Sequence, residues 1–201
     1  MNARRLLLVR TVKVLALLGL GFAVYPFVAG LLPGDGVGQT DGGRPFGHWA
    51  RVIDLAGLPP GELLRVDGWP GGPVAIYRRS DHELAGLARV ENELYDPQSQ
   101  ESRQPDALRT RTRAHLETVF VFLPTDTDRG CQVRSLPANK QPRPGIAWYG
   151  GFTEPCTGSL YDTAGRLYRG PRTARQQNLA VPHYRVLDDQ RIELLGPPPG
   201  S

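Results

Sequence analysis

Cysteine and lysine are both scarce in this chain of 201 residues, and each scarcity excludes a class of protein. Two cysteines are too few for a disulfide-dense scaffold, although they permit a single bridge. Lysine occurs only at Lys13 and Lys140, and no dense basic run is interleaved with aromatic residues, so nucleic-acid binding is not expected. Glycine and proline are abundant, at 24 and 19 residues, which favours turns and short strands over long helices.

The net charge of +4 comes from the N-terminal end of the chain. The first 13 residues carry four basic side chains and no acid, while the remaining 20 basic residues balance 20 acidic ones. The four are Arg4, Arg5, Arg10 and Lys13. The rest of the chain is formally neutral, so we expect its partners to recognise shape and loops rather than bulk charge.

Residues 14–32 form an uncharged apolar segment that is long enough for a membrane helix. Nineteen residues in a helix span about 28 Å, close to the hydrocarbon thickness of a bilayer. The basic flank at 1–13 precedes it, which predicts a cytoplasmic N-terminus and a single-pass anchor. A cleaved signal peptide is the alternative, but its apolar region is usually only about 7–15 residues long. The Arg4-Arg5 pair leaves both twin-arginine and general secretory export open.

Beyond the anchor, a glycine-rich segment at 33–45 predicts a flexible hinge, and residues 46–196 predict a soluble, mostly β head. Apolar runs bounded by turns indicate strands at 52–55, 63–66, 74–77 and 118–123, and a hairpin of 183–187 with 191–195. Ser80 followed by Asp81 and Glu83 predicts a short helix over 81–93. Residues 197–201 form a short tail that we expect to be frayed.

An alternation of arginine and threonine runs from Arg109 to Arg113. Its period of two favours the exposed face of an edge strand over an anion-binding site. No acid–base pair, catalytic triad or phosphate loop stands out, so no catalytic residue is expected. Glu154 near Cys156 and Asp162 near Arg166 are more simply interpreted as loop and turn residues.

The string EPCTGSLYDTAGRLYRGP at 154–171 resembles the second cluster-binding box of the Rieske iron–sulfur proteins, in particular the iron–sulfur subunit of quinol–cytochrome c reductase. In that family the box reads C-P-C-H-G-S, then x-Y-D, G-R and G-P. The segments IDLAGLPPGELLRV, LYDPQSQESR, NLAVPHYRV and RIELLG resemble other parts of the family, so that the resemblance covers roughly 14–196. The matching box residues are Pro155, Cys156, Gly158, Ser159, Tyr161, Asp162, Gly165, Arg166, Gly170 and Pro171.

The resemblance implies an antiparallel β-sandwich head in the periplasm, anchored in the bacterial inner membrane, with degenerate cluster-binding loops at about 129–160. It also implies protein partners in a respiratory complex. The retained Ser159 and Tyr161 match residues that hydrogen-bond to the [2Fe–2S] cluster in the family. Such a cluster is held by two cysteines on one iron and two histidines on the other.

Three of these four ligands are missing when the family's boxes are laid on this sequence. The ligand positions fall on Cys131, Val133, Glu154 and Thr157, of which only the first is a family ligand. Valine has no donor atom, and a carboxylate would be an unusual replacement for a cluster thiolate. The histidines at 48, 82, 115 and 183 lie in neither box and are interpreted as surface or structural residues. No metal or cofactor is therefore predicted.

The family's disulfide between the two boxes is also lost in its usual form, because its partners fall on Leu136 and Cys156. The resemblance implies that the loops carrying Cys131 and Cys156 lie together. We therefore expect a Cys131–Cys156 disulfide in place of the cluster, with free thiols as the alternative. A redox-active disulfide is less expected, because no C-x-x-C motif is present.

These departures predict a Rieske-like protein that has lost its cluster and serves as a non-redox structural or accessory subunit, in a complex of the quinol–cytochrome c reductase type. Two alternatives stay open. One is an electron-transfer subunit that holds a metal centre through atypical ligands. The other is a periplasmic interaction module that is unrelated to respiration.

Overall fold

The computed structural model describes Lys13 and residues 49–197. Within these residues, no helix combines the length and the apolar character that crossing a membrane requires. The predicted anchor at 14–32, the hinge at 33–45, almost all of the basic flank and His48 lie outside them. So does the tail, apart from its first residue. The described part of the head is mostly β, with three antiparallel sheets of three strands each.

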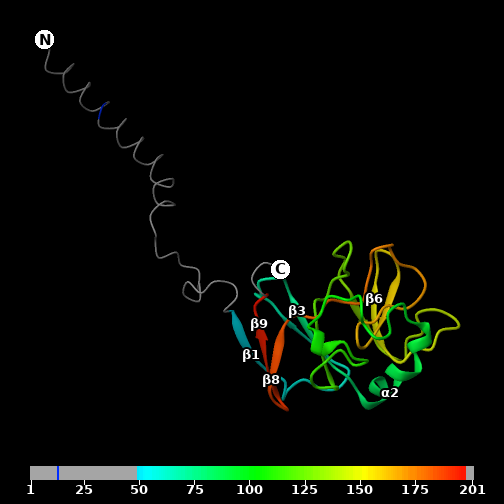
Figure 1. Cartoon of the computed structure of the whole chain (residues 1–201), viewed down its shortest axis with the longest axis horizontal. Helices are drawn as coiled ribbons and strands as arrows, with labels where there is room; N and C mark the ends of the chain where they lie inside the picture. The colour runs from blue at the N-terminus through cyan, green and yellow to red at the C-terminus, as the bar shows by residue number, and fades with distance from the viewer. Residues whose placement is uncertain (1–12, 14–48, 198–201) are drawn as a thin grey trace, which may run out of the picture. The chain divides into compact units, whose positions relative to one another are not determined.

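The first sheet joins the two ends of the head. Strand β1 (Ala50–Asp54) pairs with β9 (Arg191–Leu195), which pairs in turn with β8 (Tyr184–Asp188). All pairs are antiparallel, and the register places Ile53 opposite Ile192. Figure 1 shows the blue β1 beside the red β9 and β8. The predicted hairpin of 183–187 and 191–195 is thus confirmed to within a residue at each strand.

The second sheet carries the main apolar core. Strands β2 (Leu63–Val66), β3 (Val74–Arg78) and β4 (Val119–Phe122) lie in that order and pair antiparallel. Every residue of β4 is buried, as are the first four of β3. These continuous apolar runs pack against the first sheet and against Phe152 and Tyr161. The three predicted strands are confirmed.

Helix α2 (Asp81–Arg89) begins at a capping box. The Ser80 hydroxyl accepts a hydrogen bond from the backbone N–H of Glu83, and the Glu83 carboxylate accepts one from the backbone N–H of Ser80. Buried Glu83 also accepts a hydrogen bond from the Tyr77 hydroxyl at 2.5 Å, which fastens the helix to β3. The helix is shorter than the predicted 81–93, because a separate 3-10 turn, η2 (Glu91–Glu93), follows it.

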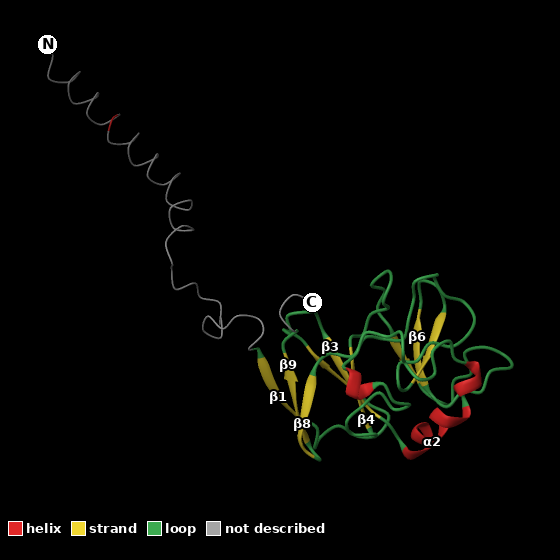
Figure 2. Ribbon diagram, viewed as in Figure 1, coloured by secondary structure: helices red, strands yellow, loops and turns green. Residues whose placement is uncertain are grey.

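The third sheet consists of β5 (Arg134–Leu136), β6 (Gly151–Glu154) and β7 (Ser159–Asp162). Figure 2 shows this sheet, marked by β6, on the side of the head away from β1, β8 and β9. A smaller apolar cluster of Val90, Leu94, Trp148, Leu160 and Tyr168 lies there. The loops that contain the two cysteines are attached to the ends of strands in this sheet, which therefore positions the candidate site.

The prediction of an edge strand over 109–113 was wrong. This segment consists of bends after the 3-10 turn η3 (Asp106–Leu108), and it contains no strand residue. Arg113 is fully buried, with a positive φ of 52°. The alternation misleads because the third arginine of the series turns inward to hydrogen-bond carbonyl groups.

Candidate functional site

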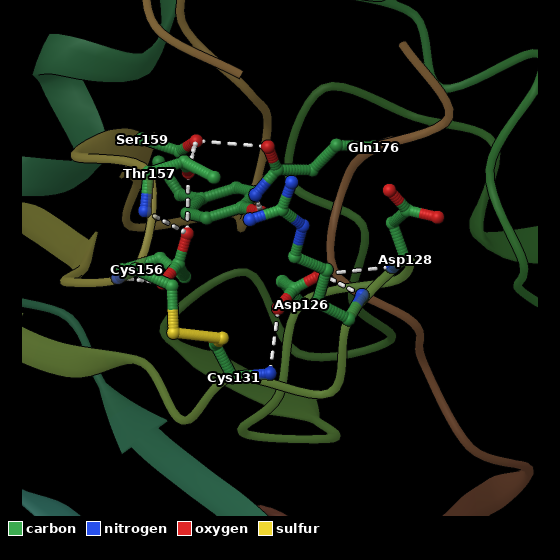
Figure 3. The surroundings of a disulfide bond; sticks show 10 residues. Asp126, Asp128, Cys131, Cys156, Thr157, Ser159 and Gln176 are labelled. Atoms are coloured by element: carbon green, nitrogen blue, oxygen red, sulfur yellow. Dashed lines mark hydrogen bonds between the residues drawn. A yellow bond between two sulfur atoms is a disulfide. The ribbon is translucent and has the colours of Figure 1, made fainter. Parts of the chain in front are cut away.

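Two loops carry the candidate site. One connects β4 to β5 and contains Cys131, and the other is the tight turn between β6 and β7 that contains Cys156. The two cysteines are joined by a disulfide, with their Cα atoms 6.4 Å apart, and this is the pair expected from the sequence. Figure 3 shows the bridge linking the two loops. Cys156 is exposed and Cys131 is partly buried, so solvent reaches the bridge from the Cys156 side.

Asp126 shapes the first loop. Its buried carboxylate accepts hydrogen bonds from three backbone N–H groups, those of Asp128, Arg129 and Cys131. The backbone N–H of Asp126 donates to the carbonyl of Cys131 and closes the turn. The position of Cys131 is therefore fixed from within its own loop. Sequence reasoning missed Asp126, although an aspartate followed by Asp128 and Gly130 is a common turn pattern.

Glu154 shapes the second loop. It is the last residue of β6 and is 0% exposed. One carboxylate oxygen, Oε1, accepts the backbone N–H of Cys156. The other, Oε2, accepts the backbone N–H and the hydroxyl of Thr157. The carboxylate thus acts as an internal cap for the turn that presents Cys156.

A chain of polar side chains continues from this turn into the interior. The Thr157 and Ser159 hydroxyl oxygens lie 2.6 Å apart, and Ser159 lies 2.8 Å from the amide oxygen of Gln176. The Gln176 amide group donates to the Tyr161 hydroxyl at 2.8 Å. Burial raises the pKa of the Tyr161 phenol above its ordinary value, so this hydroxyl also stays protonated at mildly alkaline pH.

Ser159 and Tyr161 both lie in β7, and their correspondence to cluster-contacting residues of the family stays a prediction. Gln176, which joins them, was missed (Figure 3). It lies outside both boxes, and a glutamine in a turn-rich segment gives no pattern that marks it as buried. Its burial to 2% exposure became visible only with the fold.

The remaining predicted positions are apolar or lie elsewhere. Val133 packs partly buried against the main core, and Leu136 packs against the smaller cluster. His82, His115 and His183 are exposed. In the described part of the chain, the one group of candidate metal ligands is Cys131, Glu154 and Cys156, whose donor atoms all lie within 4.8 Å of one another.

Known proteins are similar to this chain along most of its length. No family model matches the chain. The ubiquinol-cytochrome c reductase iron-sulfur subunit of Allochromatium vinosum is 34% identical over 198 residues, which cover 98% of this chain and 90% of the relative. The chain belongs to the family of Rieske iron–sulfur subunits. The corresponding subunit of Rickettsia felis is 30% identical over 96% of this chain and 93% of its own length.

A mitochondrial member is also similar to this chain. The cytochrome b-c1 complex subunit Rieske of Solanum tuberosum is 33% identical over 70% of this chain and 44% of the relative. The similarity is therefore shared by bacterial and plant members of the Rieske family. In the bacterial relatives the similarity reaches along nearly the whole chain.

The residues of this chain do not fit a [2Fe–2S] cluster. Rieske ligation needs two thiolates and two imidazoles. At the positions that the family's boxes predict, Cys131 is in a disulfide, Val133 has no donor atom and Glu154 offers a carboxylate in place of a thiolate. The Thr157 hydroxyl, at the fourth position, donates to Glu154. The disulfide instead links the two loops, and the polar chain from Glu154 to Tyr161 anchors the second loop to the interior.

Proposed function

We propose that this protein is a Rieske-family subunit that binds no [2Fe–2S] cluster and serves a non-redox, structural or accessory role in a respiratory complex of the quinol–cytochrome c reductase type. The observation that carries the proposal is the Cys131–Cys156 disulfide beside the buried, hydrogen-bonded carboxylate of Glu154. Together they occupy the loops that hold the cluster elsewhere in the family. Electron transfer through this head would need a centre that these loops do not provide.

The proposal includes a membrane-anchored arrangement. Residues 14–32 cross the bacterial inner membrane once, residues 1–13 stay in the cytoplasm and the hinge at 33–45 leads to the periplasmic head at 46–196. An oxidising periplasm also suits the disulfide. The names of the relatives place them in ubiquinol–cytochrome c reductase or the cytochrome b-c1 complex, which supports a respiratory partner for this chain.

Purification of the full chain from its native membranes in mild detergent tests the missing cluster. The expected preparation is colourless, with neither stoichiometric iron nor acid-labile sulfide. A preparation with both, and with the visible absorption of an iron–sulfur centre, would overturn the proposal in favour of electron transfer through atypical ligands.

Mass spectrometry of the same preparation tests the partner. Cytochrome b or other respiratory subunits in stoichiometric amounts are expected. Recovery of the chain alone, or with periplasmic proteins outside the respiratory chain, would favour a periplasmic interaction module instead. A double variant that halves the positive charge of the flank, with Arg4 and Arg5 changed to glutamine, controls for correct insertion, because it should lower membrane recovery without changing the head.

A further inference from the structure

Glu154 is a buried carboxylate without a cationic partner. It is 0% exposed, and no lysine, arginine or histidine of the described residues forms a salt bridge with it. Buried charges in proteins are paired with an opposite charge or coordinate a metal. The hydrogen bonds from the following turn stabilise the carboxylate, but they bring no net positive charge.

The carboxylate also keeps one acceptor position. An ionised carboxylate offers about four lone-pair sites. Oε2 accepts two hydrogen bonds from Thr157, whereas Oε1 accepts one, from the backbone of Cys156. The remaining position is therefore on Oε1, and the Sγ atoms of Cys131 and Cys156 lie within 4.8 Å of this carboxylate's ligand atom.

From these contacts we infer that, once the disulfide is reduced, Cys131, Cys156 and Glu154 bind a single zinc ion. Zinc takes thiolate sulfur at about 2.3 Å and carboxylate oxygen at about 2.0–2.2 Å in a tetrahedral arrangement. That geometry separates the two sulfurs by about 3.8 Å and each sulfur from the oxygen by about 3.5 Å. The donor atoms already lie within 4.8 Å of one another, so the zinc geometry requires the two sulfurs to move apart after reduction while the carboxylate stays within reach.

The chemistry is balanced by a dithiol reductant. A dithiol transfers two electrons and two protons to the Cys131–Cys156 bridge, which becomes two thiols while the reductant becomes a disulfide. Zinc then displaces one proton from each thiol and binds both thiolates with the carboxylate. The exposed side of Cys156 leaves the fourth position to water. This site differs from the Rieske cluster in metal and in ligands, because Glu154 replaces a ligand cysteine of the family and the position of Cys156 is not a cluster ligand there.

The inference goes beyond the proposed non-redox role and can fail independently of it. The oxidised form carries the structural bridge, and the reduced form would hold the same two loops together through the metal. The two loops would thus stay linked in either redox state, and a bound zinc ion would distinguish the reduced form.

The test uses the full chain in detergent, reduced with a phosphine that is then removed without oxygen. Titration with zinc alone should give one bound ion per chain, and the oxidised protein should bind none. Cobalt in place of zinc should show thiolate-to-metal charge-transfer absorption. Zinc binding is measured even if the reduced protein unfolds in part, because a metal that binds only the folded form shifts the equilibrium back toward that form.

Two variants define the ligands. Glu154→Gln keeps the size of the side chain and should weaken zinc binding by about tenfold or more, and Cys156→Ser should remove the charge-transfer bands. Glu117→Gln, on an exposed glutamate, is the matched control and should bind zinc like the parent. A reduced parent without bound zinc, or Glu154→Gln with unchanged affinity, would overturn the inference. Parallel incubation with iron and sulfide tests the proposed function instead, because a reconstituted iron–sulfur spectrum would contradict that proposal alone.

Discussion

Three arginine side chains lie in the interior of the head and hold the same turn, residues 162–166. Arg166 forms an ion pair with Asp162 at 2.7 Å. Arg79 donates to the carbonyl of Thr163, and Arg113 donates to those of Ala164 and Gly165. Burial lowers the pKa of Arg79 to about 10 and that of Arg113 to about 9. Backbone carbonyls thus accept most of the hydrogen bonds of Arg79 and Arg113, and the charge of Asp162 also favours both buried cations.

Replacement of Arg113 should therefore be costly. Arg113→Ala removes hydrogen bonds to Gln104 and to three carbonyls, together with packing over the Phe120 ring. We expect a loss of about 3 kcal/mol or more in the free energy of unfolding, because the carbonyls of Ala164 and Leu179 stay buried without this donor, while that of Gly165 keeps the backbone N–H of Leu179. Denaturant unfolding of the oxidised head measures it.

Arg111 is the matched control for this prediction. It belongs to the same arginine–threonine series, but its side chain is 51% exposed and pairs with Glu91 at the surface. Arg111→Ala should change stability by less than about 1 kcal/mol. Equal losses for the two variants would mean that the buried arginine is not what holds the turn.

The same series shows why the burial of Arg113 could not be predicted from the sequence. A period of two predicts that side chains alternate between the two faces of an extended strand. It does not predict which distant backbone carbonyls need a hydrogen-bond donor. Arg113 meets groups 51 to 66 residues away in the sequence. Its burial depends on those partners, so no local pattern could have separated it from Arg111.

At the scale of elements, local signals were reliable where one turn type or one cap fixes the structure. The capping box at Ser80 started α2 at the predicted residue, and apolar runs between turns placed β2, β3 and β4. The two site loops were brought together by the family resemblance, because spacing alone cannot place Cys131 beside Cys156. Neither the local patterns nor the family resemblance identified Asp126 and Gln176, because each acts through contacts that exist only in the folded loops.

Helix α2 packs closely against the loop that precedes β6, and this contact predicts whether an alanine at position 86 stabilises or destabilises the protein. A Cβ added at Gly86 would lie 2.4 Å from the Cβ and Cγ atoms of Tyr149. Helix propensity alone would make Gly86→Ala stabilising by about 1 kcal/mol. We expect destabilisation by about 1–3 kcal/mol instead, because the ring must shift. Thermal unfolding measures the difference, and in a Tyr149→Gly background, which removes both contacting atoms, the same substitution should become neutral or stabilising.

The disulfide couples the two site loops, and its loss should be measurable without any metal. Replacement of Cys131 and Cys156 by serine opens a bridge that spans 25 residues and should lower the free energy of unfolding by about 3 kcal/mol. Treatment with reductant should produce a similar loss in the parent and none in the double variant. Two thiols that react in the native, unreduced protein would contradict the bridge itself.

The head as a whole is built around phenol and guanidinium groups inside an apolar core. Tyr77, Tyr161, Tyr168 and Tyr184 are buried, and each comes from a different sheet or loop. Their hydroxyls bond to Glu83, Gln176, the carbonyl of Ala147 and the backbone N–H of His115, respectively. Folding thus removes four phenols from water together, so their ionisation reports on the integrity of the entire head.

This arrangement predicts how stability changes at alkaline pH. Burial, the largest cause in each case, raises the pKa of all four phenols above the unfolded value of about 10. Their contribution to stability is therefore fully present below about pH 10 and is lost as the pH rises toward the folded-state values. Exposed Tyr95 behaves oppositely, because its hydrogen bond with Arg172 lowers its pKa.

Ultraviolet absorbance of the phenolate during a pH titration checks both directions. The first change should come from Tyr95 and should disappear in Tyr95→Phe, while the four buried tyrosines should ionise only as the head unfolds. The free energy of unfolding should fall with pH above about 10, by an amount that Tyr161→Phe reduces. Ionisation of all the tyrosines together near pH 10, with the circular dichroism of the fold unchanged, would show that these phenols are not held in the interior.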